Sequence, residues 1–186
     1  MRIIAGRFRG TALAAVGKGD AAAHLRPTSD RVRESLFSML MHLGVVPGAR
    51  VLDLFAGTGA LGIEALSRGA THVTLIENGR VGARLIQENI AKLRIDAEVT
   101  LLRQDATRPG ACPGEPFDLV FLDPPYGKGM GQTALSAARD GGWIAPGALV
   151  VWEENAPMLP PPGFSREDTR KYGDTHVTLL SLTAQP

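Results

Sequence analysis

Short apolar runs that alternate with helix-like stretches from Pro47 onward constrain the fold of this chain more than any other feature of its sequence. The runs have the length and composition of buried strands, and apolar residues at a helical spacing follow most of them. We expect strands at 50–55, 72–77, 98–105, 117–123, 148–153 and 175–182. The alternation predicts an α/β fold, with a mostly parallel sheet, helices on both of its faces and a C-terminal antiparallel hairpin.

The chain before Pro47 has a different pattern. Residues 2–16 are typical of a short β-hairpin, and 17–23 form a loop of small residues. Thr28 and Ser29 are candidate caps for a following amphipathic helix, which Gly44 ends.

Length and composition indicate one soluble domain. The 186 residues are enough for a single core, and we divide them into a basic N-terminal β-hairpin and loop at 1–24 and a main domain at 25–186. The single cysteine, Cys112, cannot form an internal disulfide, which favours a reducing compartment. The chain shows neither a secretory signal at its start nor a membrane-length apolar run, so we expect a cytoplasmic protein without a membrane partner. The four histidines lack ligand spacing, so we expect no metal.

The first strand opens onto a glycine-rich turn. Gly57, Gly59 and Gly62 form a G-x-G-x-x-G pattern, and Glu77 ends the next strand. Glycines permit a sharp turn and a close approach of a ligand to the backbone. The pattern fits a nicotinamide dehydrogenase as well as an S-adenosylmethionine enzyme, and a plain tight turn is the alternative without function.

Acidic residues at successive strand ends distinguish these two kinds of cofactor. A pyrophosphate would be repelled by Asp53, whereas the ammonium and sulfonium of S-adenosylmethionine would be attracted to it. Glu77 is placed to accept hydrogen bonds from ribose hydroxyls, and Asp105 from the adenine amino group. Three acids without a phosphate cradle favour S-adenosylmethionine as the cofactor, although Glu77 or Asp105 alone could be a helix cap or a loop acid.

The strand at 117–123 ends in Asp123-Pro124-Pro125-Tyr126. Two prolines stiffen the strand exit and leave carbonyl acceptors. An amino nitrogen conjugated with a ring becomes positive as it attacks a methyl group, and the Asp123 carboxylate and Pro124 carbonyl could accept its two N–H bonds. Tyr126 could stack on the flat group. The motif therefore predicts methylation of a planar amino nitrogen.

Several long blocks resemble the RsmD family of bacterial 16S ribosomal RNA guanine-N2 methyltransferases. They are RIIAGRFRG at the start, LRPTSDRVRESLF at 25–37, LDLFAGTGALGIEALSRGA at 52–70 and LDPPY at 122–126, with Lys171-Tyr172-Gly173 before the last strand. The central motifs occur in many methyltransferases, so the N-terminal blocks carry the specificity of the match. The resemblance implies a Rossmann-like class I methyltransferase fold with an N-terminal β-hairpin extension.

The resemblance also implies a function and a set of site residues. The expected reaction moves a methyl group from S-adenosylmethionine to the exocyclic N2 of a specific guanine in 16S rRNA, guanine 966 of the family. We expect catalysis at Asp123, Pro124, Pro125 and Tyr126. The residues expected to bind the cofactor are Asp53, Phe55, Gly57, Gly59, Glu77, Asn78, Asp105 and Ala106.

The first 33 residues carry a net charge of +5, and the remaining 153 carry −4. A basic end suggests a surface for a polyanion, although a solvated terminus would have the same composition. With the resemblance, the expected partner is 16S rRNA, free or within a small-subunit assembly intermediate, and the expected state is a monomer. The candidate RNA-binding residues are Arg7, Arg9, Arg26, Arg31 and Arg33. Arg31 or Arg33 could instead pair with Asp30 or Glu34.

Other functions remain open at this point. The motif at 123–126 also fits methylation of DNA adenine N6 or of a protein glutamine amide, the latter disfavoured by the basic N-terminus. A nicotinamide dinucleotide-binding Rossmann protein is disfavoured by Asp53, and a non-catalytic RNA-binding module by the complete set of strand-end groups. We assign no role to Glu153, Glu154 or Lys171.

Overall fold

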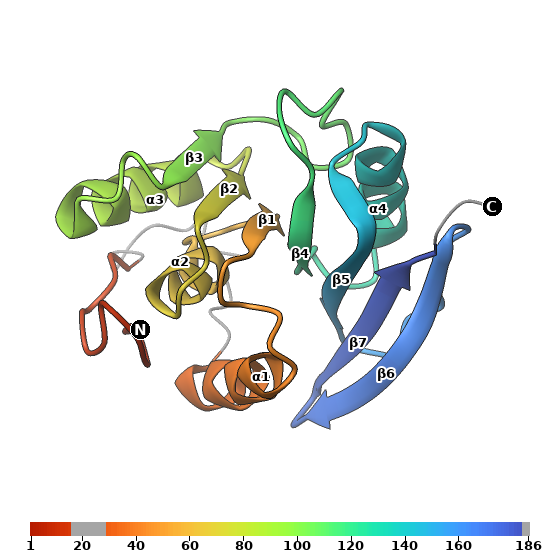
Figure 1. Cartoon of the computed structure of the whole chain (residues 1–186), viewed down its shortest axis with the longest axis horizontal. Helices are drawn as coiled ribbons and strands as arrows, with labels where there is room; N and C mark the ends of the chain where they lie inside the picture. The colour runs from red at the N-terminus through yellow and green to blue at the C-terminus, as the bar shows by residue number, and fades with distance from the viewer. Residues whose placement is uncertain (16–28, 184–186) are drawn as a thin grey trace.

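The computed structural model describes residues 1–15 and 29–183. Its centre is a seven-stranded sheet in the order β3-β2-β1-β4-β5-β7-β6 (Figure 1). The strands are β1 Arg50–Leu54, β2 His72–Ile76, β3 Val99–Leu102, β4 Phe117–Leu122, β5 Ile144–Glu154, β6 Phe164–Tyr172 and β7 Thr175–Leu182. The helices are α1 Asp30–His42, α2 Ala60–Ser67, α3 Arg80–Leu93 and α4 Met130–Asp140.

The strands β1 to β5 are parallel, and β7 and β6 join them antiparallel, as the sequence predicts. The chain runs outward from β1 to β3 and then returns to place β4 on the other side of β1. Strand order thus reverses between β1 and β4, and α/β folds bind ligands beyond the carboxyl ends of the strands at such a reversal.

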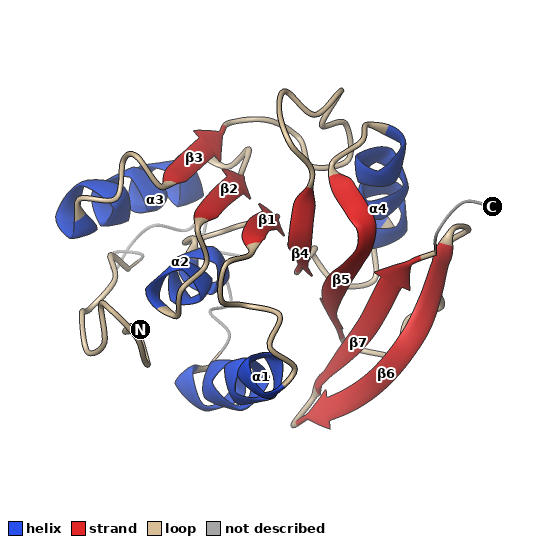
Figure 2. Ribbon diagram, viewed as in Figure 1, coloured by secondary structure: helices blue, strands red, loops and turns tan. Residues whose placement is uncertain are grey.

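Helices cover both faces of the sheet, which confirms that prediction (Figure 2). One core cluster joins α1, α2 and α3 to Val51, Leu119 and Phe121, and the other joins α4 to Leu52 and Val120. Neighbouring strand residues thus enter opposite cores, because side chains alternate between the faces of a strand.

Three elements differ from the sequence expectation by more than one residue. The third strand is shorter, at 99–102, and the fifth begins at Ile144 rather than at 148. The N-terminal arms turn back on each other, with the Gly10 N–H donating to the Ile3 carbonyl at 2.8 Å. Their β pairing is the single bridge between Arg2 and Ala12, so within 1–15 the predicted hairpin is a looped segment without strands. Residues 16–28, with the predicted loop at 17–23 and the proposed boundary at 24, lie outside the described part.

The start of α1 follows the predicted capping chemistry. The Ser29 hydroxyl accepts the Val32 N–H at 3.3 Å and caps the helix. Among the residues that the structure describes, no helix is both long and apolar enough to cross a lipid bilayer.

Candidate functional site

The turn after β1 is held in a backbone conformation that suits glycine. Gly57 and Gly59 have φ values of 57° and 76°, and Phe55 shares this left-handed region at 63°. The Gly59 N–H donates to the Ala56 carbonyl at 2.7 Å, and α2 begins at the next residue. A Cβ on Gly59 would lie 3.1 Å from Ile86 Cγ1, so the turn also packs tightly against α3.

Asp53 lies beneath this turn with only 1% of its surface exposed. Its Oδ2 accepts the Gly62 N–H at 3.0 Å, in the first turn of α2. Burial raises the pKa of Asp53 to about 7; the Gly62 N–H lowers the pKa and the nearby Glu77 raises it. The site therefore holds an acid whose ionised form a cation would stabilise.

Glu77 follows β2 and binds the backbone of two loops. Its Oε2 accepts the Gly57 N–H at 2.7 Å, and its Oε1 accepts the Gly79 N–H at 2.6 Å. Burial raises its pKa, while these two N–H groups lower it. The sequence did not predict that the Glu77 side chain would hydrogen-bond to the backbone of these loops. Each oxygen retains a second lone pair, so the predicted ribose contact stays compatible with the geometry.

A small hollow opens between the ends of β1, β2 and β3. Its lining residues are Phe55, Ile76, Glu77, Asn78, Gln104 and Ala106. Four of them are predicted cofactor-binding residues, and the structure brings those four together. Ile76 and Gln104 were missed, although each lies within two residues of the end of a predicted strand.

Asp105 is partly buried beside this hollow but does not line it. Its Oδ1 accepts both the backbone N–H and the hydroxyl of Thr107, each at 2.8 Å. These two hydrogen bonds lower the pKa of Asp105. The carboxylate therefore shapes the loop after β3, and its contact with adenine stays a prediction.

Four carboxylates gather where β1, β4 and β5 end. Pairing of Leu54 with Leu122 places Asp53 and Asp123 at the same edge of the sheet. Burial raises the pKa of Asp123 well above its usual range, and the charges of Glu153, Asp53 and Glu154 raise it further. The predicted meeting of Asp53 and Asp123 in one site is thus observed, and they are joined by Glu153 and Glu154, to which the sequence assigned no role.

The Asp-Pro-Pro-Tyr segment leaves this edge in a defined conformation. Pro124 is buried, Pro125 is exposed and the ring of Tyr126 is partly buried. The Tyr126 hydroxyl donates to Glu153 Oε1 at 3.2 Å. Burial raises the pKa of Tyr126, so the phenol stays protonated and acts as a donor.

The residues present fit S-adenosylmethionine. The described lining of the hollow contains a carboxylate and no Lys or Arg side chain, and further carboxylates lie at the neighbouring strand ends. This arrangement suits a cation and disfavours a pyrophosphate. Within 1–15 and 29–183, no group of three or more His, Cys, Asp or Glu side chains is arranged to hold a metal ion, and the absence of a metal stays a prediction.

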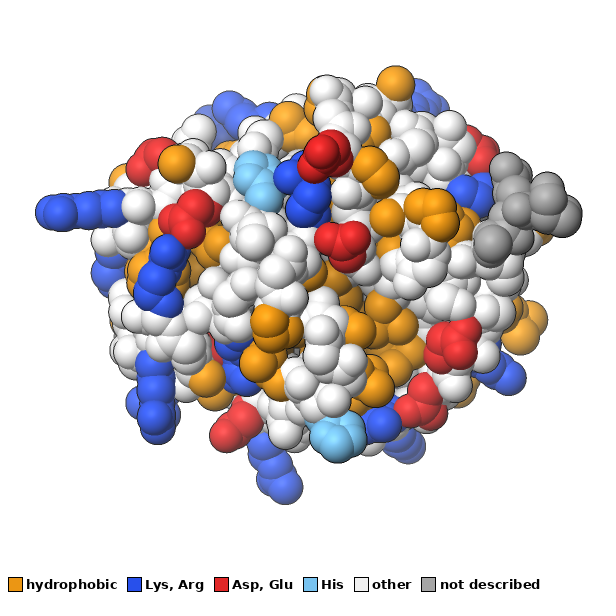
Figure 3. All heavy atoms as spheres, viewed as in Figure 1, with side chains coloured by type: hydrophobic (Ala, Val, Ile, Leu, Met, Phe, Trp, Pro, Cys, Tyr) orange, Lys and Arg blue, Asp and Glu red, His pale blue; other side chains and the backbone are white. Residues whose placement is uncertain are grey.

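The predicted RNA-binding arginines fall into three groups: exposed, buried and outside the described residues. Arg7, Arg9 and Arg31 are exposed, and Arg7 also forms an ion pair with Glu98 at 2.8 Å. Arg26 lies outside the described residues. Figure 3 shows Lys and Arg side chains along its left-hand edge, where the N-terminal segment and α3 lie in Figure 1, with acidic side chains among them.

The prediction for Arg33 is wrong in this structure, because its side chain is fully buried and cannot reach a phosphate. It donates to Asp30 Oδ1 at 3.0 Å and to the Arg2 carbonyl, and it lies 3.8 Å from Glu64. Glu64 in turn accepts the N–H groups of Ile4 and Ala5, at 2.8 and 3.1 Å. Arg33 thus helps to attach the N-terminal segment to the body of the protein.

The chain is similar to known proteins over nearly its full length. The chain matches the family model described as Conserved hypothetical protein 95 over residues 1–181. It is 37% identical over 188 residues to Ribosomal RNA small subunit methyltransferase D of Escherichia coli strain K12, covering 100% of this chain and 91% of that protein. It is 35% identical over 176 residues to the protein of the same name from Haemophilus influenzae, covering 89% and 85%. The solved structure of yhhF from Escherichia coli superimposes with a TM-score of 0.83 at 35% identity, covering 100% of this chain and 99% of that one.

Proposed function

Because the chain belongs to the RsmD family, whose model is described as Conserved hypothetical protein 95, we propose that it methylates the exocyclic N2 of a guanine in 16S rRNA. The family and the Rossmann-like class I methyltransferase fold agree with the sequence expectation. Curated relatives named as small-subunit rRNA methyltransferases support an rRNA substrate. Methylation at N2, and guanine 966 as the target, are parts of the proposal that the names of these relatives do not state.

The observation that carries the proposal is the meeting of Asp53 and Asp123 at one edge of the sheet, beside the hollow after β2. Bound S-adenosylmethionine supplies a methyl group on a sulfonium that is open to nucleophilic attack. Asp53 stabilises the positive end of this donor, while Glu77 and the lining of the hollow hold its nucleoside. The glycine turn lets the backbone approach the donor closely.

The Asp-Pro-Pro-Tyr segment acts on the nucleophile. The Asp123 carboxylate and the Pro124 carbonyl accept the N–H bonds of the guanine amino group, and Tyr126 stacks on the base. These acceptors stabilise positive charge as it develops on the nitrogen, which is electrostatic stabilisation by fixed groups. The raised pKa of Asp123 makes it a competent acceptor for the surplus proton.

The target base must leave its stack to reach Tyr126, because an exocyclic amino group inside a helix is sterically shielded. Exposed arginines of the N-terminal segment and α1 bind phosphates of the rRNA and supply affinity without sequence information. The segment is fixed to α2 through Glu64, so these contacts have a defined position relative to the donor loop.

The experiment that tests this proposal is incubation with labelled S-adenosylmethionine and 16S rRNA from cells that lack the enzyme, free and in small-subunit particles, followed by nucleoside analysis. We expect labelled N2-methylguanosine. Labelled N6-methyladenosine or unlabelled RNA would contradict the proposal. Calorimetry with nicotinamide dinucleotide should show no binding.

A further inference from the structure

Glu153 and Glu154 end β5 and are only 6% and 5% exposed. Burying a carboxylate is costly unless hydrogen bonds compensate for the lost water. Here the burial adds to the charge around Asp123, since both residues raise the pKa of that group. The burial of two carboxylates next to the proposed reaction centre therefore needs a physical explanation.

Both carboxylates contact the segment that leaves β4. The Tyr126 hydroxyl donates to Glu153 Oε1 at 3.2 Å. The next residue, Gly127, donates its N–H to Glu154 Oε1 at 3.1 Å, and Glu154 Oε2 accepts the Asn155 N–H at 2.8 Å. The end of β5 therefore holds the side chain of Tyr126 and the backbone that follows it.

The position of this end of β5 is itself fixed. Trp152 pairs with Leu122 of β4 on one side and with Thr178 of β7 on the other. Glu153 pairs with Val177 in the same register. Because β5 lies between two strands, its terminal carboxylates offer acceptors at fixed positions rather than on a mobile loop.

We propose that Glu153 is a positioning residue that sets the orientation of the Tyr126 ring, while Glu154 fixes the backbone after it. The inference rests on the proposed function, in which Tyr126 stacks on the target base. The ring is attached to the chain at one end and held through its hydroxyl at the other. A stacking surface held at both ends loses less conformational freedom when a base arrives.

The kinetic test compares Glu153→Ala, Glu153→Gln, Tyr126→Phe and the double variant Glu153→Ala/Tyr126→Phe in single-turnover methylation of the rRNA. We expect Glu153→Ala to slow methyl transfer by roughly tenfold to a hundredfold with unchanged donor affinity, as misplacement of a reacting group does. Glu153→Gln keeps an acceptor oxygen and should restore most of the rate. Tyr126→Phe keeps the ring but loses the hydrogen bond to Glu153 together with the side-chain hydrogen bond to Thr175. Since the contact with Glu153 is already absent in Tyr126→Phe, the double variant should be no slower than the slower single variant.

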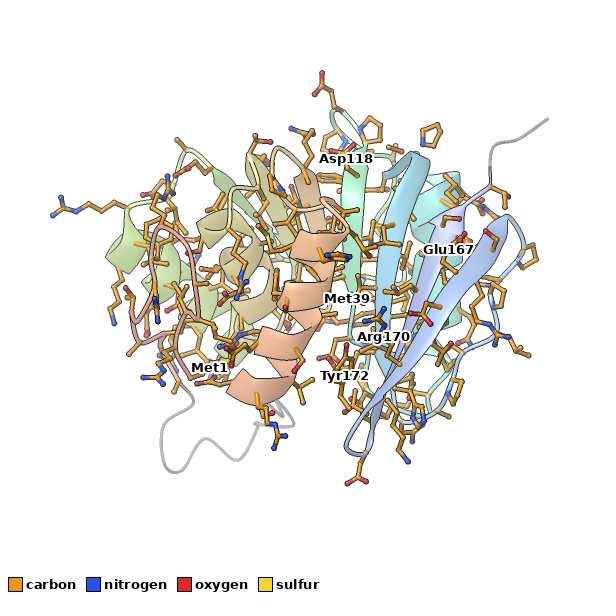
Figure 4. All side chains as sticks on the ribbon, turned by 60° about the horizontal axis from the view of Figure 1, so that its bottom comes forward. Met1, Met39, Asp118, Glu167, Arg170 and Tyr172 are labelled. Atoms are coloured by element: carbon orange, nitrogen blue, oxygen red, sulfur yellow. The ribbon has the colours of Figure 1, made fainter. Side chains whose placement is uncertain are left out.

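Glu167→Ala is the matched control, because it removes an exposed carboxylate at the end of the β6–β7 hairpin opposite Tyr172 (Figure 4). Its rate should equal that of the unaltered protein. Equal rates for Glu153→Ala and the unaltered protein would overturn the proposal. So would a Glu153→Gln variant as slow as Glu153→Ala, or multiplicative losses in the double variant.

A second readout needs no substrate and separates failure of this inference from failure of the proposed function. The chain has two tyrosines, and Tyr172 lies beside α1 (Figure 4). In protein with labelled tyrosine rings, Glu153→Ala should shift or broaden the NMR signal of Tyr126 more than that of Tyr172, which pairs with Thr175, a second side-chain partner of Tyr126. An unchanged Tyr126 signal would overturn the positioning role. Lack of rRNA methylation by the unaltered protein, with the Tyr126 signal shifted as expected, would overturn the proposed function and leave the contact established.

Discussion

At the scale of single residues, the buried carboxylate of Asp53 links the physical chemistry of the site to its proposed ligand. Its hydrogen bond comes from a backbone N–H, and burial holds its pKa at about 7. The group is therefore partly protonated near neutral pH. A cationic donor favours the ionised form, so binding and ionisation are coupled.

This coupling predicts a pH dependence of donor affinity. Below a pH of about 7, Asp53 holds a proton that must leave before the cation gains its full attraction. Affinity for S-adenosylmethionine should therefore rise as the pH is raised through 7 and level off above it. Calorimetry in buffers of different ionisation enthalpy measures both the affinity and the released proton. Asp53→Asn is the control. This variant should bind S-adenosylmethionine weakly, and its affinity should change with pH only through titration of the donor itself. The same pH slope in both proteins would exclude Asp53 as the linked group.

Asp123 should affect the rate rather than donor binding. We expect Asp123→Ala to slow single-turnover methylation by roughly 10²–10³-fold, the usual loss for one electrostatic contact to a transition state. Donor affinity measured by calorimetry should stay nearly unchanged, because the proposed partner of Asp123 is the substrate amino group. Normal turnover in this variant would remove Asp123 from the mechanism.

The sequence could predict which residues meet at the site but not how each one bonds. Parallel strands end at one edge, so Asp53 and Asp123 were expected to lie together. The bonding of Glu77 to two loop N–H groups depends on turn geometry, which residue spacing does not define. Arg33 was misjudged from its charge, although its spacing to Phe37 and Leu40 places it on the buried face of α1.

At the scale of elements, α2 connects the two proposed binding regions. Its first turn donates to Asp53, and its Glu64 and Ser67 side chains accept N–H groups of the N-terminal segment. Burial of Glu64 is thus matched by hydrogen bonds and by Arg68 at 2.7 Å. The position of α2 against the sheet should consequently affect stability and donor binding together.

Gly62→Ala tests this packing. A Cβ at this position would lie 2.5 Å from Leu75 Cδ2 and 2.7 Å from Val73 Cγ1, both on β2. The helix or these two side chains must therefore shift, and we expect the free energy of unfolding to fall by about 1–3 kcal/mol, as for other overpacked cores. Urea denaturation measures the change. Gly114→Ala, where the new Cβ meets nothing within 4 Å, should leave stability nearly unaltered; equal effects at both sites would contradict the packing argument.

Element prediction succeeded where apolar runs are long and failed where other residues interrupt them. Pro146 and Gly147 lie within the first residues of β5, and such residues usually mark a turn. Ile144 pairs with Phe117 and Leu149 with Leu119, so Pro146 and Gly147 lie in an irregular stretch between two points of pairing with β4, which local sequence does not reveal.

At the scale of the whole molecule, the alternation of strands and helices defined the architecture but not the strand order. Right-handed crossovers limit the arrangements, yet they do not decide on which side of β1 the fourth strand inserts. That choice creates the switch point and places Asp123 beside Asp53. The basic charge of the first 33 residues could likewise be read from the sequence, whereas the exposure of each arginine could not.

The exposed arginines of the N-terminal segment provide the last test, because phosphate contacts leave a signature in salt dependence. Replacing Arg7 and Arg9 together by Ala should reduce the slope of log affinity against log salt by about 1.4–1.8, according to whether the bound RNA is single- or double-stranded. Filter binding of 16S rRNA over a salt series measures this slope. Replacing Arg166 and Arg170 by Ala removes the same charge from exposed positions on β6 and is the matched control. If both double variants changed the slope equally, net charge rather than the N-terminal segment would control RNA affinity, and the RNA-binding surface would have to be placed elsewhere.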